Sequence, residues 1–327
     1  MSTGPSQAPA PDHTLISDLL DVLDKLSGFH PGFRPAHAKG VMVAGTFTPA
    51  AGAKELTRAP HATRPSTPVI VRFSASAGVP TVADNDPKGA SPRGIAIRFS
   101  LADHVHTDIV AHSHNGFAVH TGEEFLAFLS AVAASGPDST HPTPLDTFLA
   151  THPKAVQFVT APKPIPTSYA REAFYAITAF QFTNQAGVSR YGRFRIRPEA
   201  GTDYLSDADA AKQTHDFLTD ELTARLANGP AVFRIFVQLA EDSDVVTDSS
   251  AVWPEDRPDV EFGTLTLTHR VDETAPEFWK IIFDPDPRVD GIAPAGDPLT
   301  QVRAALYLLS GRRRRTAPIH SGSAAGT

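Results

Sequence analysis

The sequence feature that most restricts the fold is a series of short β-rich runs that begins at Val41. Val, Ile, Phe and Thr dominate these runs, and clusters of Pro, Gly and Asp separate them, as is typical of strands joined by turns. The runs are 41–49, 68–76, 93–101, 108–120, 175–184, 192–200, 231–240 and 260–270. Because few helices alternate with these roughly eight strands, the pattern predicts an α+β fold built on an antiparallel barrel or sandwich.

Helical stretches are expected around and between the strands, at 14–27, 123–135, 206–229 and 298–313. The first has apolar residues at helical spacing, a Thr/Ser-type cap and a stop at Gly28, and the third begins at Ser206 and ends at Gly229.

No change of composition divides the chain between its ends, so residues 13–315 are expected to form a single domain. Residues 1–12 and 316–327 are rich in small and polar residues. We therefore expect a disordered tail over 1–12 and a flexible tail over 316–327.

The composition excludes several classes of protein. A chain of 327 residues with 41% hydrophobic and 20% charged residues is typical of soluble globular proteins, and the net charge of -7 argues against a general nucleic-acid binder. No apolar run approaches the ~18 residues of a membrane span, and the first twenty residues have neither the basic nor the apolar region of a secretory signal. The absence of Cys excludes disulfides, iron–sulfur clusters, thiolate zinc sites and a Cys-ligated haem. Together these features predict a cytoplasmic protein.

Arg303 and Tyr307 are four residues apart on the expected helix 298–313, so their side chains share one face. A guanidinium next to the ring oxygen favours the phenolate, and a phenolate is a hard anionic ligand for ferric haem iron. The same spacing also occurs in ordinary surface packing, so it leaves both interpretations open.

Two further stretches contain residues suited to peroxide and anion chemistry. His37 lies in a loop rich in Gly and Pro, between Arg34 and Lys39. A neutral imidazole there can accept a proton from one peroxide oxygen and return it to the other, or it can be an ordinary hydrogen-bonded loop histidine. Arg72, inside an apolar strand, requires an anion, which is either a partner carboxylate or a bound propionate, and Ser74 shares its face.

Two clusters allow more than one interpretation. Four consecutive arginines at 312–315 predict a solvated tail or an anion-binding patch, and Arg314 returns to the face of Tyr307 if the helix continues for two more turns. His112 and His114 share a face if residues 108–120 are one strand, and would make a metal pair, but no third ligand follows at a clear position.

Five stretches occur in an order and spacing that resemble the haem catalases across about residues 29–315. They are RPAHAKG (34–40), TPVIVRFS (67–74), DPKGASPRGIAIRF (86–99), RFRIRPEAG (193–201) and GIAPAGDPLTQVRAALY (291–307). The resemblance implies an antiparallel eight-stranded β-barrel of catalase type with surrounding helices, and haem b as the cofactor. It also implies that His37 is the distal acid–base, that Ser74 hydrogen-bonds it, and that Arg34, Arg72 and Arg314 bind the haem propionates.

On the other side of the haem, the resemblance implies that Tyr307 is the iron ligand and that Arg303 keeps it as a phenolate. The distal asparagine of the family has no direct counterpart. An ungapped match puts His112 and Ser113 at that place, and Asn115 takes the role if the register shifts.

The chain resembles the short catalase-related peroxidases, because it lacks the N-terminal arm, the wrapping segment, the C-terminal flavodoxin-like domain and a recognisable dinucleotide site of large catalases. This implies a haem peroxidase that uses hydrogen peroxide or organic hydroperoxides to oxidise small organic donors, as a monomer or homodimer. The alternatives are a weak true catalase, an enzyme that converts fatty-acid hydroperoxides, a non-catalytic haem binder and a haem-free barrel that binds other ligands.

Overall fold

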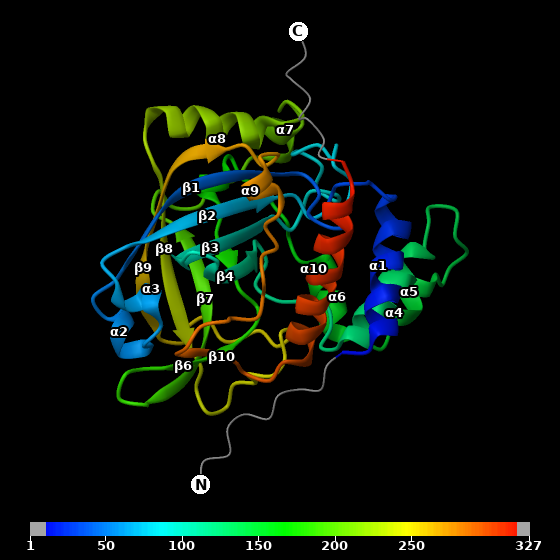
Figure 1. The fold of residues 1–327 in the computed structure, drawn as a ribbon. Helices are drawn as coiled ribbons and strands as arrows, with labels where there is room; N and C mark the ends of the chain where they lie inside the picture. The colour runs from blue at the N-terminus through cyan, green and yellow to red at the C-terminus, as the bar shows by residue number, and fades with distance from the viewer. Residues whose placement is uncertain (1–10, 319–327) are drawn as a thin grey trace.

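The β-rich runs form a closed antiparallel barrel in the computed structural model, which describes residues 11–318 (Figure 1). Around the barrel the order is β1-β2-β3-β4-β5-β7-β8-β9, and β9 pairs with β1 to close it, while β6 pairs with the other end of β7 and carries β10. The strands are β1 (Gly40–Pro49), β2 (Thr67–Ser74), β3 (Gly94–Ala102), β4 (Val105–His112), β5 (Phe174–Tyr175), β6 (Phe180–Thr183), β7 (Ser189–Pro198), β8 (Ala231–Leu239), β9 (Asp259–Val271) and β10 (Ile292–Pro294). The predicted eight-stranded antiparallel barrel is confirmed.

The interior of the barrel is filled by alternate residues of each strand, because successive side chains point to opposite faces. Val71, Phe73, Ile95 and Ile97 are at most 1% exposed and belong to one continuous core. The residues between them, such as Arg72, therefore project from the outer face of the barrel. This outer face, and not the barrel interior, is where polar side chains gather.

Helices surround the barrel on more than one side (Figure 1). The helices are α1 (His13–Ser27), α2 (Ala53–Leu56), α3 (Pro60–Thr63), α4 (Gly122–Ala133), α5 (Pro144–Leu149), α6 (Pro153–Thr160), the 3-10 turn η1 (Tyr169–Arg171), α7 (Asp207–Ala210), α8 (Phe217–Asn228), α9 (Pro276–Trp279) and α10 (Pro298–Thr316). Leu19 of α1 packs against Val302 and Leu306 of α10 in a separate apolar cluster. Figure 1 shows α10 between the barrel and α1, so one face of α10 is directed toward the strands. Among the helices of residues 11–318, none has the length and apolar character needed to cross a bilayer.

Two predicted strands are wrong in extent. The run 108–120 is a strand only as far as His112, because the chain turns where Gly116 N–H donates to the His114 carbonyl. The run 175–184 is divided into β5 and β6. In the break between them, Thr178 accepts a hydrogen bond from Arg303 of α10 at 3.3 Å. The residues between β5 and β6 thus contact a helix that is distant in the sequence.

The predicted helix 206–229 is also wrong as one continuous element, since α7 and α8 are separate. Ser206 and Gly229 cap the outer ends as expected. At the break, Asp84 from the β2–β3 connection accepts from Leu218 N–H, and Asp84 N–H donates to the His215 carbonyl. Tertiary hydrogen bonds therefore replace the helical ones.

The ends of the predicted domain need smaller adjustments. The cap of α1 is Asp12, whose carboxylate accepts from Thr14 N–H, and not a Thr or Ser. α10 ends at Thr316, one residue inside the predicted flexible tail. The rest of the predicted tails, apart from residues 11–12 and 317–318, lies outside the described residues.

Candidate active site

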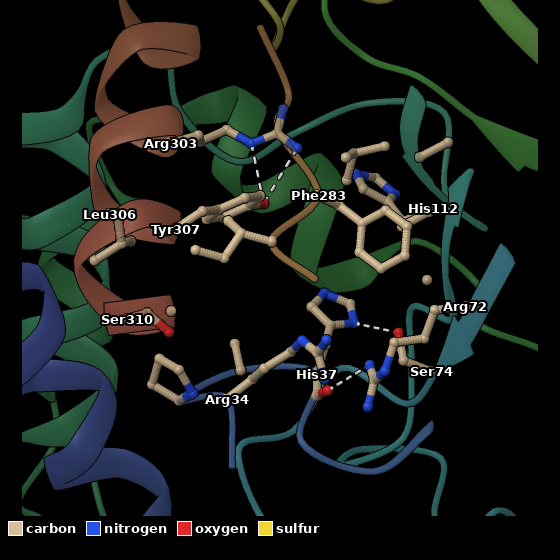
Figure 2. Close-up of a pocket in the computed structure, with 18 of the residues that line it drawn as sticks. Arg34, His37, Arg72, Ser74, His112, Phe283, Arg303, Leu306, Tyr307 and Ser310 are labelled. Atoms are coloured by element: carbon tan, nitrogen blue, oxygen red, sulfur yellow. Dashed lines mark hydrogen bonds between the residues drawn. The ribbon is translucent and has the colours of Figure 1, made fainter. Parts of the chain in front are cut away.

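A cavity of about 230 Å³ lies between the outer face of β2–β4 and α10. The loop before β1, the segment 281–283 and the side chains of Leu23, Phe117, Phe125 and Ile177 also contribute to its walls, which are mostly apolar. Figure 2 shows His37 and Tyr307 projecting into this space from the loop and from α10. The lining residues are Leu23, Arg34, Pro35, Ala36, His37, Arg72, Ser74, Gly94, Ile95, Ala96, Val110, Ala111, His112, Phe117, Phe125, Ile177, Ile281, Ile282, Phe283, Arg303, Leu306, Tyr307, Ser310, Gly311 and Arg314.

The strand register places three residues in one row across the cavity wall. Ser74 of β2 pairs with Gly94 of β3, and Gly94 pairs with His112 of β4. Directly paired residues of antiparallel strands share a face, so Ser74 and His112 flank a position that has no side chain. A Cβ at Gly94 would lie 2.6 Å from Ser74 Oγ and 2.8 Å from His37 Nδ1. Glycine therefore leaves the space into which the His37 ring fits.

His37 is held in an unusual backbone conformation. Its φ of 57° lies in the left-handed region, which a non-glycine residue adopts only when its surroundings stabilise it. The His37 N–H donates to the Ser76 carbonyl at 3.0 Å, and Arg72 donates to the carbonyls of His37 and Ala38 at 2.8 and 3.0 Å. The buried Arg72 side chain thus stabilises the conformation of the loop that carries His37.

The His37 ring is neutral and oriented. Its Nδ1 lies 3.0 Å from Ser74 Oγ. Burial, followed by the positive charges of Arg72, Arg303 and Arg34, lowers the pKa of His37 to about 4. At neutral pH the ring can therefore accept a proton, and Ser74 limits its rotation.

Three arginines meet at one end of the cavity around one carboxylate. Glu273 accepts from Arg34 at 2.7 Å and from Arg72 at 2.6 Å. Although burial favours the neutral acid, Arg72 and Arg34 lower the pKa of Glu273 to about 2. Arg314 donates to the carbonyls of Trp279 and Ile281 and is not paired with Glu273. Three guanidinium groups against one carboxylate leave two positive charges.

These arginines stay charged at neutral pH and are incompletely paired. Burial, together with the charges of Arg72 and Arg314, lowers the pKa of Arg34 to about 9, and burial lowers the pKa of Arg314 to about 10. Arg34 Nη2 and Arg314 Nε are buried and find no hydrogen-bond partner within residues 11–318. Guanidinium N–H groups without partners at a cavity wall can donate to a bound anion.

On α10, Arg303 and Tyr307 make the contact that their spacing predicts. Arg303 Nε and Nη2 donate to the Tyr307 hydroxyl oxygen at 3.4 and 3.3 Å, and Nη1 donates to Thr178. Figure 2 shows the guanidinium directed at the ring oxygen. Two N–H groups on one oxygen stabilise negative charge on that oxygen.

The structure brings seven of the eight predicted site residues to this cavity, namely Arg34, His37, Arg72, Ser74, Arg303, Tyr307 and Arg314. Asn115 is not among the described side chains that line it. β4 ends at His112, which the register with Gly94 directs into the cavity, and Asn115 follows in the turn. The geometry therefore gives the predicted role of Asn115 no support. Nor does it support a metal pair at His112 and His114, since no three or more His, Asp or Glu side chains of residues 11–318 converge on a metal site.

Sequence reasoning missed three residues that shape the site. Glu273 comes from a loop some two hundred positions after Arg72, and no local pattern marks it. Gly94 directly follows Arg93 in the stretch 86–99, so the sequence shows its place at the start of an apolar strand. The sequence does not show that the His37 ring fills the space above it. Thr178 is apparent only when the break between β5 and β6 is known.

Comparisons with known proteins agree with this architecture. The family model described as Catalase matches residues 12–321. The chain is 36% identical over 298 residues to the catalase-related peroxidase of Mycolicibacterium paratuberculosis, covering 90% of this chain and 93% of that protein. It is 30% identical to the catalase-related peroxidase of Synechococcus elongatus, covering 90% and 87%.

Solved structures show the same fold. Catalase A from Saccharomyces cerevisiae superposes with a TM-score of 0.76 at 20% identity, over 96% of this chain and 66% of that one, and a fungal catalase gives 0.76 at 21% identity with the same coverage. The barrel with its external cavity is thus the catalase fold, and the chain spans about two thirds of the length of these catalases. The chain belongs to the catalase family. The match over nearly the whole of two short relatives groups it with the catalase-related peroxidases.

Proposed function

We propose that this chain is a haem-dependent peroxidase that uses hydrogen peroxide or an organic hydroperoxide to oxidise small organic donors. The observation that carries the proposal is the meeting, in one apolar cavity, of a neutral His37 and a Tyr307 oxygen that accepts two hydrogen bonds from Arg303. The names of the two catalase-related peroxidases support the same reaction class.

The cavity suits haem b. Two surplus positive charges from Arg34, Arg72 and Arg314 against Glu273 match the two propionates of a haem, and the unpaired N–H groups of Arg34 and Arg314 are suitable donors to them. The apolar walls suit a porphyrin. Tyr307 is the residue that would hold the iron, because its oxygen is the acceptor stabilised by Arg303.

A bound haem supplies the redox chemistry, in which the peroxide is reduced and the organic donor is oxidised. The protein's part on the peroxide side is proton transfer. His37 accepts a proton from one peroxide oxygen at Nε2 and returns it to the departing oxygen, which leaves as water or an alcohol. Ser74 holds the ring through Nδ1, and the low pKa of His37 keeps it ready to accept.

The test compares two activities of the purified haem-loaded protein. Oxidation of a dye donor is followed by absorbance, and oxygen release from hydrogen peroxide is followed with an oxygen electrode. We expect donor oxidation that requires His37 and little oxygen release. Vigorous oxygen release without donor oxidation would instead indicate a true catalase and refute the peroxidase.

Two variants separate the remaining alternatives. Tyr307→Phe should weaken or shift the Soret band, and a wild-type protein without a Soret band after reconstitution would indicate a haem-free barrel. His37→Ala should keep the haem and lose the peroxide reaction, whereas a non-catalytic haem binder would be unaffected. Conversion of a fatty-acid hydroperoxide without any added donor would identify a hydroperoxide-converting enzyme.

A further inference from the structure

His112 is a second imidazole in the cavity that the proposed proton transfer does not use. It ends β4, pairs with Gly94, and lies on the opposite side of Gly94 from Ser74. The His37 ring occupies the space above Gly94. The two imidazoles therefore share one part of the cavity wall, and Figure 2 shows both among the lining residues.

The hydrogen bonds of His112 decide where its proton resides. The backbone N–H of His114 donates to His112 Nδ1 at 3.2 Å, so Nδ1 is an acceptor. Burial, followed by the charges of Arg303, His114 and His37, lowers the pKa of His112 to about 3, so the ring is neutral at physiological pH. A neutral imidazole that accepts at Nδ1 must carry its proton on Nε2. The backbone of its own turn thus fixes the tautomer.

The Nε2–H of His112 lacks a partner. The atom is buried and makes no hydrogen bond within residues 11–318. A buried donor is costly to leave unsatisfied, and such groups in a cavity commonly bond a ligand or ordered water. The ring cannot serve as a base through Nε2 while its tautomer is held. It can only donate.

We propose that His112 donates a hydrogen bond from Nε2 to an oxygen atom of the bound peroxide, while His37 accepts and returns the peroxide proton. This inference rests on the proposed function. His112 keeps its own proton throughout, so the two imidazoles have complementary tasks set by their partners: Ser74 for His37 and the His114 N–H for His112. A positioned donor that stabilises charge on oxygen contributes substantially to catalysis.

The experiment uses the haem-loaded protein and two readouts. Fluoride, a compact hydrogen-bond acceptor, is titrated against the ferric protein and followed by the visible spectrum. The second-order reaction with hydrogen peroxide is followed by stopped flow. His112→Phe keeps a ring of similar shape without the donor, His112→Gln restores an N–H, and His114→Phe makes the same exchange two residues away while leaving the backbone N–H in place.

We expect His112→Phe to raise the dissociation constant for fluoride about tenfold, as for one lost hydrogen bond to an anion, and to slow the peroxide reaction about 100-fold. His112→Gln should recover most of both losses, and His114→Phe should match the wild type. Haem content and circular dichroism check folding, and the glutamine variant still decides the matter if the phenylalanine variant does not fold.

The role of His112 would be overturned if His112→Phe had the fluoride affinity and the peroxide rate of the wild type, even with peroxidase activity present. It would also be overturned if His112→Gln and His112→Phe showed equal losses. A wild-type protein that binds haem and fluoride but does not react with peroxide would instead overturn the proposed function, and the fluoride comparison would still decide whether His112 donates. A wild-type protein that takes up no haem would overturn both.

Discussion

Substitution of Gly94 by Ala tests whether the position of His37 controls the peroxide reaction. The added Cβ would lie 2.6 Å from Ser74 Oγ and 2.8 and 2.9 Å from the Nδ1 and Cε1 atoms of His37. Ordinary contacts begin near 3.4 Å, so the imidazole has to retreat by at least about 0.6 Å or rotate away from Ser74. Displacements of about 1 Å at a reacting group cost on the order of 100-fold in rate.

We therefore expect Gly94→Ala to slow the stopped-flow reaction with hydrogen peroxide by about 10- to 100-fold. Overpacking of this kind also costs about 1–3 kcal/mol in the free energy of unfolding. Haem content should stay unchanged, because Tyr307 and Arg303 lie on α10 and the three atoms nearest to the new Cβ belong to Ser74 and His37.

Two controls separate crowding from other effects. Gly52→Ala adds the same methyl group where no other atom lies within 4 Å, so its rate and stability should match the wild type. Ser74→Ala removes the hydrogen bond to His37 Nδ1 without adding volume, and we expect a smaller loss, about tenfold. A Gly94→Ala protein with full haem content and the wild-type rate would refute the reasoning. Loss of haem together with activity would show a general collapse of the cavity.

Three further predictions concern buried charges and titrating groups. Because His37 must be neutral to accept a proton and its pKa is about 4, the rate of the peroxide reaction should be level from about pH 8 to 5 and fall as the pH drops through about 4. Stopped-flow rates with a midpoint near the ordinary histidine pKa of ~6.5 would contradict this. Glu273→Gln leaves Arg34 and Arg72 without their shared carboxylate, so urea unfolding of the haem-free protein should show a free energy of unfolding lower by about 3 kcal/mol, and the loss should be smaller once haem is bound. Equal losses in both forms would be inconsistent with propionate binding by these arginines. His61 is 1% exposed, its ring lies 4.7 Å from the Phe99 ring, and burial lowers its pKa to about 3, so between about pH 6.5 and 3 the unfolded chain binds one more proton and acid destabilises the fold. On going from pH 7 to 5, the free energy of unfolding of His61→Leu should therefore gain about 2 kcal/mol relative to that of the wild type. Parallel curves of stability against pH for the two proteins would disprove this.

Several features were readable from the sequence because they depend on residues close together in the chain. Strand patterning predicted an antiparallel barrel or sandwich, and the barrel is the arrangement found. The four-residue spacing of Arg303 and Tyr307 placed both side chains on one face, where two hydrogen bonds join them. Arg72 was expected to need an anion, and Glu273 is one of the two alternatives that were left open. The order of five matching stretches indicated the family, which the comparisons confirm.

Other expectations failed where long-range hydrogen bonds override a local pattern. The helical pattern of 206–229 continues through the point where Asp84 and His215 interrupt it, and these partners are more than a hundred residues apart. The predicted role of Asn115 rests on the linear spacing of a motif. The end of β4 depends instead on the chain turning at 113–116, which brings His112 to the cavity.

The sequence by itself determined the class of fold and the chemistry available on α10, because helical and strand periodicities are local properties. Only the tertiary structure decided how that chemistry is arranged. The row of Ser74, Gly94 and His112 exists because three strands pair in one register, and a shift of one residue would turn all these side chains to the other face. The hollow for His37 follows from that register, which no segment of the chain specifies alone, whereas the tautomer of His112 is set by the turn that follows β4.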